Sequence, residues 1–236
     1  LTRLGADGFG DTLRAALAGR GVDVALVATD TEAATGASTV LAGEGDYQSI
    51  IAPGAAGRLS PEDIRNAAPA IAAAGALIVQ LEIDPAISAE AASIAARSGR
   101  MVVLNASPAP EGWEAIPPSL AGAATVLVVN RVEAGRLLGR AVGTEEAAVA
   151  LAARTGIGTV IVTLGGDGAL GISDGTVVRQ PAFPATVVDT VGAGDAFLGT
   201  VVVALLEGRP LAEALRRGAA AGAIAVSRRG VYEALP

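Results

Sequence analysis

Short apolar runs alternate with amphipathic segments along almost the whole chain. The apolar runs are rich in Val and Ile and do not alternate with polar residues, which is typical of parallel strands buried on both faces. The predicted strands cover residues 24–28, 76–81, 101–104, 126–129 and 159–164. The predicted helices cover residues 8–18, 87–97, 131–138, 144–154, 193–206 and 210–226, and one more begins at Ser60 and Pro61. Such repeated strand–helix units predict an α/β fold of three layers with a mostly parallel, doubly wound sheet.

One region departs from this pattern. Residues 36–52 contain two strand-like runs joined by a Gly-Glu-Gly-Asp stretch at 43–46, which indicates an antiparallel hairpin. A hairpin that protrudes from an α/β core can be a lid, a dimer contact or a plain sheet edge, and the pattern leaves these alternatives open. Because the sequence contains no linker rich in Pro, Ser or charge, we expect residues 1–236 to form one domain with this hairpin as an appendage.

The composition restricts the chemistry that the chain can perform. It has no Cys and no His, and all 17 basic residues are Arg. These absences exclude a thiol nucleophile, a disulfide, the usual zinc sites and the base of a Ser-His-Asp triad. Without Lys there is no Schiff base and no Walker-type lysine. Catalysis would have to use carboxylates, hydroxyls, backbone amides, Arg or a hard cation.

The charge and the hydropathy restrict the partners. The formal net charge of −7 leaves no basic patch to neutralise nucleic-acid phosphates. The mean hydropathy of +0.51 is high, but no run approaches the ~18 apolar residues that a membrane span needs. No signal peptide is visible, and the absence of Cys is compatible with the cytosol. We therefore expect a cytoplasmic protein that binds neither nucleic acid nor a membrane.

The stretch from Val187 to Phe197 carries the clearest chemical signal. It reads Val-Val-Asp-Thr-Val-Gly-Ala-Gly-Asp-Ala-Phe and predicts an apolar strand, a glycine turn and a long helix. A glycine turn that opens a helix presents free backbone N–H groups and the positive end of the helix dipole, so it binds anions. Asp195 in this turn could accept a proton from an attacking hydroxyl or could simply cap the helix. The spacing alone leaves both functions open.

The segment 189–197 resembles the C-terminal signature of the ribokinase family of carbohydrate kinases. Other segments match that family in the same order, and together they span essentially the whole chain. They are Gly5-Ala-Asp-Gly-Phe-Gly10, Pro53-Gly-Ala55 with Leu59-Ser-Pro-Glu62, Val79-Gln-Leu-Glu82, Leu104-Asn105 with Pro108-Ala109, Asn130-Arg-Val-Glu133, Thr163-Leu-Gly-Gly-Asp-Gly168 and Ala225-Val-Ser-Arg-Arg-Gly230. The resemblance implies a ribokinase-like fold with a small β lid at about 36–52.

The same resemblance implies ATP-dependent phosphorylation of a sugar, with D-ribose at its 5-hydroxyl as the expected substrate. Asp195 would be the general base, and Gly192, Ala193 and Gly194 would form the anion hole for the transferred phosphoryl group. Glu82 and Asp195 would bind the sugar, because a carboxylate can accept hydrogen bonds from two neighbouring hydroxyls. The residues expected to contact ATP are Asn130, Thr163, Leu164, Gly165, Gly166, Asp167, Gly168 and Gly194.

Two cation sites are also implied by the resemblance. Glu133 would act near Mg²⁺ and the phosphates together with Asn130, although the pair taken alone favours a helix N-cap and its partner. A monovalent cation, K⁺, would be held by Asp189, Val191, Ala225, Arg228, Gly230 and Ala234. Ala234 stands where the family has Ser, and Arg131 replaces the acid common after the motif Asn. Gly218 stands where the family often has an Asn beside the adenine.

The N-terminal part of the family pattern has no counterpart here. Nothing matches its first strand with a sugar-binding Asp or its Gly-Gly-Lys/Arg-x-x-Asn segment, so we expect the domain to be N-terminally incomplete. Two alternatives to ribose phosphorylation stay open. One is another sugar or nucleoside kinase of the family, such as a fructokinase-like enzyme, and the other is a catalytically incompetent member that binds nucleotide or sugar. We also expect a homodimer through the lid.

Overall fold

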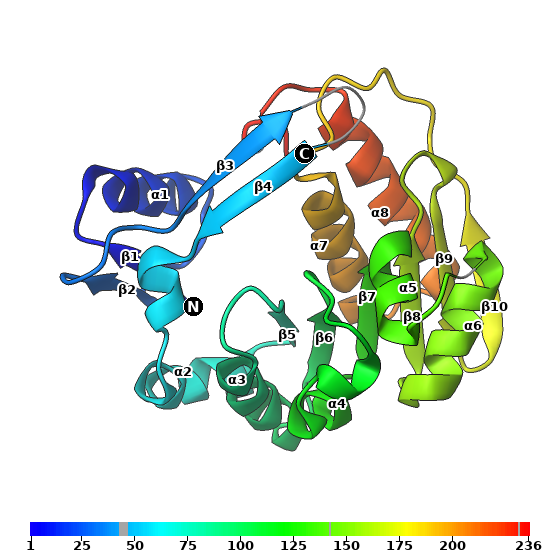
Figure 1. The fold of residues 1–236 in the computed structure, drawn as a ribbon, viewed down its shortest axis with the longest axis horizontal. Coiled ribbons are helices and arrows are strands. Elements are labelled where there is room, and N and C mark those ends of the chain that lie inside the picture. The colour runs from blue at the N-terminus through cyan, green and yellow to red at the C-terminus, as the bar shows by residue number, and fades with distance from the viewer. Residues whose placement is uncertain (43–46, 142, 231) are drawn as a thin grey trace.

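A six-stranded sheet forms the centre of the molecule (Figure 1). The computed structural model describes residues 1–236 apart from 43–46, 142 and 231. The strands lie in the order β10-β9-β8-β7-β6-β5. Strands β5 to β8 run parallel to one another, whereas β9 runs antiparallel to both of its neighbours, β8 and β10. Their bounds are β5 Ala76–Val79, β6 Met101–Asn105, β7 Val126–Asn130, β8 Thr159–Thr163, β9 Ala169–Ser173 and β10 Thr176–Gln180. The predicted α/β class with a mostly parallel sheet is confirmed, although the sequence patterns missed β9 and β10.

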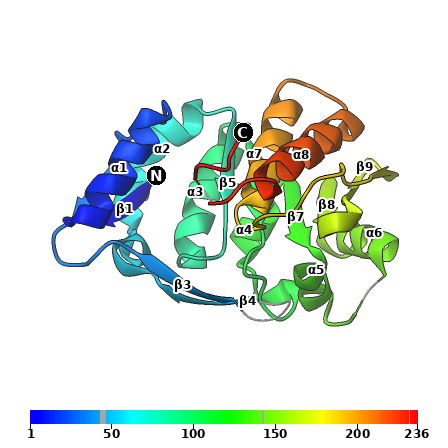
Figure 2. The ribbon, with the colours of Figure 1, turned by 90° about the horizontal axis from the view of Figure 1, so that it is seen from above.

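Helices cover both faces of this sheet and complete the three layers (Figure 2). Successive strand residues point to opposite faces, so Val102 and Leu104 join one apolar cluster while Val103 joins the other. The first cluster contains residues of α2 Pro61–Ala73, α3 Pro85–Arg97, α4 Pro118–Ala123, α5 Arg131–Leu138 and α6 Thr144–Thr155. The second contains residues of α7 Ala193–Leu206 and α8 Leu211–Val226. Among the described residues, no helix combines the length and the hydropathy needed to cross a membrane.

The N-terminal residues form a unit of their own beside the large sheet (Figure 1). Strands β1 Thr2–Gly5 and β2 Val27–Asp30 pair in parallel, with α1 Gly8–Gly19 between them in sequence. Strands β3 Ala37–Ala42 and β4 Tyr47–Ala52 then pair antiparallel, as predicted, and stand away from the layered core in both views. The expected turn at 43–46 lies outside the described residues. The described residues also form the short 3-10 helices η1 Gly54–Arg58, η2 Trp113–Ala115 and η3 Gly165–Asp167.

Residues 5–10, one of the segments that resemble the ribokinase family, bind the backbone just before strand β3 of the hairpin. The Asp7 carboxylate caps α1 by accepting from Gly10 N, and it also accepts from both the backbone N–H and the hydroxyl of Thr35 at 2.8 Å. The Thr35 hydroxyl oxygen in turn accepts from Gly5 N at 2.9 Å. A side chain on Gly5 would collide with this arrangement, because its Cβ would lie 2.4 Å from Thr35 N. In this chain, segment 5–10 therefore fixes where the hairpin begins.

Three predicted strands have wrong boundaries, and backbone hydrogen bonds account for two of the differences. The strand expected at 24–28 begins at Val27, because residues before it form a turn in which Val27 N donates to Val24 O. The strand expected at 76–81 ends at Val79, since Leu81 N leaves the ladder to donate to Ser107 O. The strand expected at 159–164 ends one residue early, at Thr163.

The strand expected before the glycine turn is also wrong. Val187 and Val188 lie in an irregular segment and are more than half exposed. Pro181 and Pro184 stand earlier in this segment, and prolines have no N–H with which to join a ladder. Val188 N donates instead to Val226 O at the end of α8, at 2.7 Å. The chain consequently reaches the glycine turn through a loop that is hydrogen-bonded to the C-terminal end of α8.

Candidate active site

The N-terminus of α7 is an open anion site. Gly192 precedes the helix in the left-handed conformation, with φ of +80°, and no side chain caps the helix. The backbone N–H groups of Gly194 and Asp195 donate to no acceptor within the described part of the chain. The space above Gly194 is open, because a Cβ placed there would meet no atom within 4 Å. Free N–H groups and the positive end of a 14-residue helix thus face the same space.

Four other helices contrast with this arrangement. A side-chain oxygen caps each of α1, α2, α3 and α5; the residues are Asp7, Ser60, Asp84 and Asn130. Capping satisfies the first N–H groups of a helix and adds about 1 kcal/mol of stability. Helix α7, like α4, α6 and α8, begins without such a cap. At α7 the free donors follow a glycine turn and lie beside Asp195, an arrangement that suits the binding of a phosphoryl group.

Asp195 stands in the first turn of α7, beside these free donors. Its side chain is accessible from the surface, yet the surrounding protein removes part of its water, and this desolvation raises the pKa of its carboxyl above the ordinary value of 3.8. A raised pKa makes a carboxylate a better proton acceptor. The arrangement can therefore hold an anion and take a proton within one helical turn.

Asn130 and Glu133 form a reciprocal cap at the start of α5. The Asn130 side chain accepts from Glu133 N at 2.9 Å, and Glu133 Oε2 accepts from Asn130 N at 2.7 Å. Glu133 is buried, but its second oxygen, Oε1, has no hydrogen bond in the described part of the chain. The local reading, a helix cap with its partner, is thus what the hydrogen bonds show, and one carboxylate oxygen remains for a ligand.

The glycine-rich turn 163–168 adjoins this cap. Thr163 lies directly opposite Asn130 in the register of β7 and β8. The turn is closed by its own backbone, with Leu164 N donating to Gly168 O at 2.8 Å. Gly168 is required there, because its φ is +96° and a Cβ would lie 2.0 Å from Gln180 O. The structure thus brings the predicted ATP residues of both loops to one edge of the sheet.

The residues predicted to hold the monovalent cation are brought together in part. Asp189 Oδ1 accepts from Val191 N at 3.1 Å and its Oδ2 accepts from Gly230 N at 3.4 Å. Ala225 lies one residue before the end of α8, and its carbonyl already accepts from Arg228 N. Ala234 is buried, and its neighbour Leu235 packs against the apolar cluster of Ala196, Ala221 and Ala225. Segments 188–191, 225–230 and 234–235 therefore form one cluster at the beginning of α7 and the end of α8.

Glu82 lines a cavity to which none of the other predicted site residues contributes. It stands three residues beyond the end of β5, and the cavity measures about 250 Å³. The other lining residues are Leu1, Thr2, Leu59, Ile64, Leu77, Ile78, Val79, Gln80, Ile83, Ile87, Ser88 and Ala91. No hydrogen bond or ion pair within the described residues joins Glu82 to Asp195 or to the glycine-rich turn. Its predicted contact with a sugar stays a prediction.

Comparison with known proteins decides the family. The model of the pfkB family of carbohydrate kinases matches residues 1–236. The chain belongs to this family. Its fold is ribokinase-like: the structure of Arabidopsis thaliana ribokinase complexed with ribose and ATP superimposes with a TM-score of 0.87 at 31% identity, covering 100% of this chain and 78% of that one. This pfkB-family chain is therefore a carbohydrate kinase by descent, as the motifs predict.

The curated relatives include both ribokinases and deoxyribokinases. The chain is 34% identical to ribokinase of Haemophilus influenzae, over 99% of this chain and 76% of that one. It is also 30% identical to deoxyribokinase of Salmonella typhimurium, over 100% of this chain and 78% of that one. These identities support a sugar kinase and leave the sugar to be determined.

The oxygen atoms of the candidate site can be compared with those that the expected Mg²⁺ and K⁺ would need as ligands. No cluster of three acidic side chains occurs in the described residues. Mg²⁺ does not need one, since it is commonly held by one or two carboxylates, waters and substrate phosphates. The free Oε1 of buried Glu133 fits such a site, and the carboxylate of Asp189 with nearby backbone carbonyls fits a monovalent cation.

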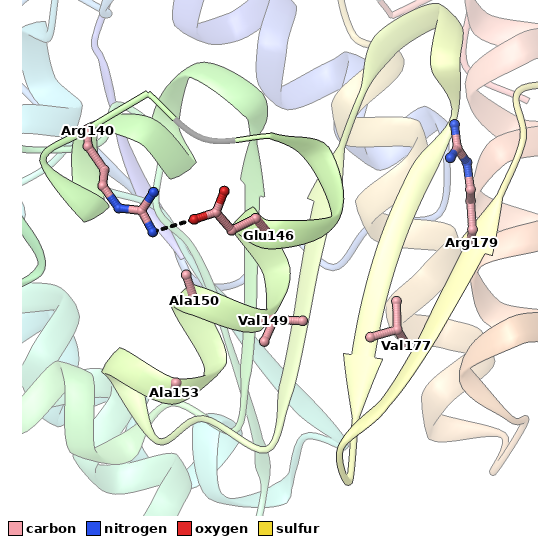
Figure 3. Close-up of a pocket in the computed structure, with 7 residues that line it drawn as sticks. All are labelled: Arg140, Glu146, Val149, Ala150, Ala153, Val177 and Arg179. Atoms are coloured by element: carbon pink, nitrogen blue, oxygen red, sulfur yellow. Dashed lines mark ion pairs between the residues drawn. The ribbon is translucent and has the colours of Figure 1, made fainter.

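A larger cavity, of about 570 Å³, lies between α6 and β10 (Figure 3). It is lined by Arg140, Glu146, Val149, Ala150, Ala153, Val177 and Arg179. Arg140 is paired with Glu146 at 2.7 Å. None of the residues predicted from the pfkB-family motifs lines this cavity, so its size does not make it the sugar site.

The sequence patterns gave no sign of one contact beside Asn130 and the glycine-rich turn. Arg131, the first residue of α5, places Nη2 2.7 Å from Asp167 Oδ2 in the glycine-rich turn. The two residues are 36 positions apart, and no local pattern links them. The exchange of the usual acid for Arg131 is the one signal in the sequence that could have pointed to this pair.

Proposed function

We propose that this chain transfers the γ-phosphoryl group of ATP to the 5-hydroxyl of D-ribose, giving D-ribose 5-phosphate and ADP. The observation that carries the proposal is the start of α7: free N–H groups of Gly194 and Asp195 with no capping side chain, next to a carboxyl whose pKa is raised. Phosphoryl transfer needs positioning and electrostatic stabilisation more than covalent chemistry. A chain without Lys, His or Cys can supply both in this way.

In the proposed reaction the Asp195 carboxylate accepts the proton of the sugar hydroxyl as its oxygen attacks the γ-phosphorus. The bond from that phosphorus to the oxygen bridging the β- and γ-phosphates breaks, and ADP leaves with the electron pair. Negative charge that develops on the transferred group is met by the free N–H groups of Gly194 and Asp195. Each of these donors is fixed by the helix, so little reorganisation accompanies the step.

The nucleotide would lie along the edge formed by Asn130 and the glycine-rich turn 163–168. Support comes from the register that sets Asn130 opposite Thr163, and from the ATP in the Arabidopsis thaliana ribokinase complex. Mg²⁺, when bound, would neutralise phosphate charge, and Glu133 would hold it. Asp189, Val191, Ala225, Arg228, Gly230 and Ala234 would hold K⁺, with Ala234 offering no hydroxyl. ATP, Mg²⁺ and K⁺ are parts of this proposal.

A second substrate has specific support. The 30% identity to a deoxyribokinase makes 2-deoxy-D-ribose the main competitor of D-ribose. Glu82, in the 250 Å³ cavity, is the carboxylate proposed to accept hydrogen bonds from sugar hydroxyls. A site built to bind a hydroxyl discriminates strongly against a substrate that lacks it. Glu82 is thus the residue through which the sugars would be distinguished if it contacts the 2-hydroxyl.

A sugar panel tests the proposed function. ADP release from ATP is followed by a coupled assay with D-ribose, 2-deoxy-D-ribose, D-fructose and a nucleoside, and the phosphorylated product is identified by mass spectrometry. We expect the highest kcat/KM with D-ribose. A preference for another sugar would identify that sugar as the substrate in place of D-ribose. Absent ADP release would favour a catalytically incompetent, ligand-binding member.

The hairpin β3–β4 is proposed to act as the lid and as the contact of a homodimer. Ile50 and Ile51 of β4 are 65% and 53% exposed, which is unusual for neighbouring large apolar residues unless another surface covers them. Light scattering of the protein and of Ile50→Ser tests this: a dimer that the substitution dissociates is expected, and a wild-type monomer would contradict the contact.

A further inference from the structure

Arg131 occupies a position that the reaction described above leaves unexplained. It follows Asn130 directly, and its guanidinium reaches across to Asp167 in the glycine-rich turn. Both segments belong to the edge where the nucleotide is proposed to lie. A basic side chain therefore spans the two loops that would flank the phosphates.

The partner that Arg131 now has is a weak one. The Arg131 and Asp167 side chains are 48% and 65% exposed. An ion pair this open to solvent is worth only ~0–1 kcal/mol, because water and salt screen it. Arg131 can consequently exchange Asp167 for a stronger anion at small cost. A phosphate accepts two parallel N–H donors from a guanidinium, which is among the strongest hydrogen-bonded arrangements available to Arg.

The charge of the surroundings creates a need for such a cation. Four carboxylates belong to the candidate site, namely Glu133, Asp167, Asp189 and Asp195. The chain as a whole carries a net charge of −7 and has no Lys to offer. These carboxylates would repel a polyanionic triphosphate, and a basic side chain beside its path would reduce that repulsion in addition to any bound metal ion.

We propose that Arg131 binds the phosphate groups of the nucleotide, exchanging its ion pair with Asp167 for a direct contact with them. The inference rests on the proposed function, because it takes the Asn130 edge to be the nucleotide site. Asp167 then serves as a surrogate anion: it holds the guanidinium in place while the site is empty and competes with the incoming phosphate.

Calorimetric titration of the whole 236-residue chain with ATP and with adenosine tests this inference. For Arg131→Ala we expect the Kd for ATP to rise roughly 10- to 100-fold, the usual effect of losing a hydrogen bond between charged groups. The Kd for adenosine, which has no phosphate, should stay within about twofold. The Kd of Arg131→Lys for ATP should lie between those of wild type and Arg131→Ala, since lysine keeps the positive charge but loses the two parallel N–H donors of the guanidinium.

Arg136 supplies the matched control. It lies on the same helix, is 50% exposed and is paired only distantly, at 3.8 Å, with Glu111. Arg136→Ala should leave both Kd values within about twofold of wild type. Removing the competitor by Asp167→Asn should tighten ATP binding by about two- to fivefold, the worth of an exposed ion pair. Thermal melting of each variant verifies that it is folded.

The outcomes separate this inference from the proposed function. If Arg131→Ala leaves the Kd for ATP unchanged while wild type phosphorylates sugar, only the inference is overturned. If Arg131→Ala and Asp167→Asn weaken ATP and adenosine alike, the pair merely ties the turn to α5, and the inference is again wrong. If wild type neither binds ATP nor releases ADP, the proposed function fails and the inference fails with it.

Discussion

Replacing Gly168 by Ala should damage the glycine-rich turn more than any neighbouring substitution. The φ of Gly168 is +96°, a conformation that residues with a Cβ rarely adopt. The added Cβ would lie 2.0 Å from Gln180 O, 2.6 Å from Ala182 N and 2.7 Å from the Pro181 carbonyl carbon. All three are backbone atoms of one segment, so no side chain can rotate away to relieve the collision.

The expected loss of stability follows from these two effects. The unfavourable φ costs about 1–2 kcal/mol, and forcing a packed segment apart costs a further ~1–3 kcal/mol. The sum, about 2–5 kcal/mol, is a large part of the free energy of unfolding of a typical domain. Gly166 in the same turn is the control: its φ is not positive and a Cβ would meet no atom within 4 Å.

Urea denaturation followed by circular dichroism measures both variants. We expect Gly168→Ala to lower the free energy of unfolding by the amount above and Gly166→Ala to leave it within ~0.5 kcal/mol of wild type. Equal, small effects of the two substitutions would refute the reasoning, because they would mean that segment 180–182 does not approach the turn as closely as described.

Three further predictions concern the caps and the carboxyls. Asn130→Ala removes the acceptor for Glu133 N, and urea denaturation should show a loss of about 1 kcal/mol; an unchanged midpoint would contradict the cap. Backbone N–H donors lower the pKa of Asp7 and Asp30, so these carboxylates stabilise the fold above their ordinary pKa of 3.8 and the contribution is lost as pH falls through the lowered values. The free energy of unfolding should therefore decrease on acidification below about pH 4, and an increase would show the sign to be wrong. Because desolvation raises the pKa of Asp195, the acidic limb of a kcat/KM profile should lie above the titration of an ordinary aspartate, and a limb at or below that titration would argue against this residue as the base.

Local signals in the sequence predicted most of the elements. Ser60 followed by Pro61 marked a helix start that the structure shows as a complete capping box with Asp63. The bounds of α5 and α7 agree with the prediction, because each begins at a recognisable polar or glycine signal after an apolar stretch. Burial on both faces likewise left its mark in the unbroken apolar runs of the parallel strands.

Features that depend on distant residues could not be predicted in this way. Val187 and Val188 read as a strand by composition, but the prolines before them and the carbonyl of Val226 direct them elsewhere. The approach of Gly230 N to Asp189 joins residues 41 apart. For the site, the residue types came from motif resemblance and the free donors at α7 were expected from the glycine turn, whereas the Arg131 pair required coordinates. Domain organisation, dimerisation and the cytosolic location stay predictions.

Sugar-dependent ADP release by wild type and by Asp195→Asn tests the central claim most directly. Asp174→Asn is the control, since this exposed aspartate lies in the turn between β9 and β10 with φ of +49°, a conformation that Asn tolerates. With D-ribose we expect Asp195→Asn to lower kcat by roughly 10²- to 10⁴-fold, with the Kd for ATP nearly unchanged and Asp174→Asn fully active. Turnover retained in Asp195→Asn would contradict the assignment of Asp195 as the general base.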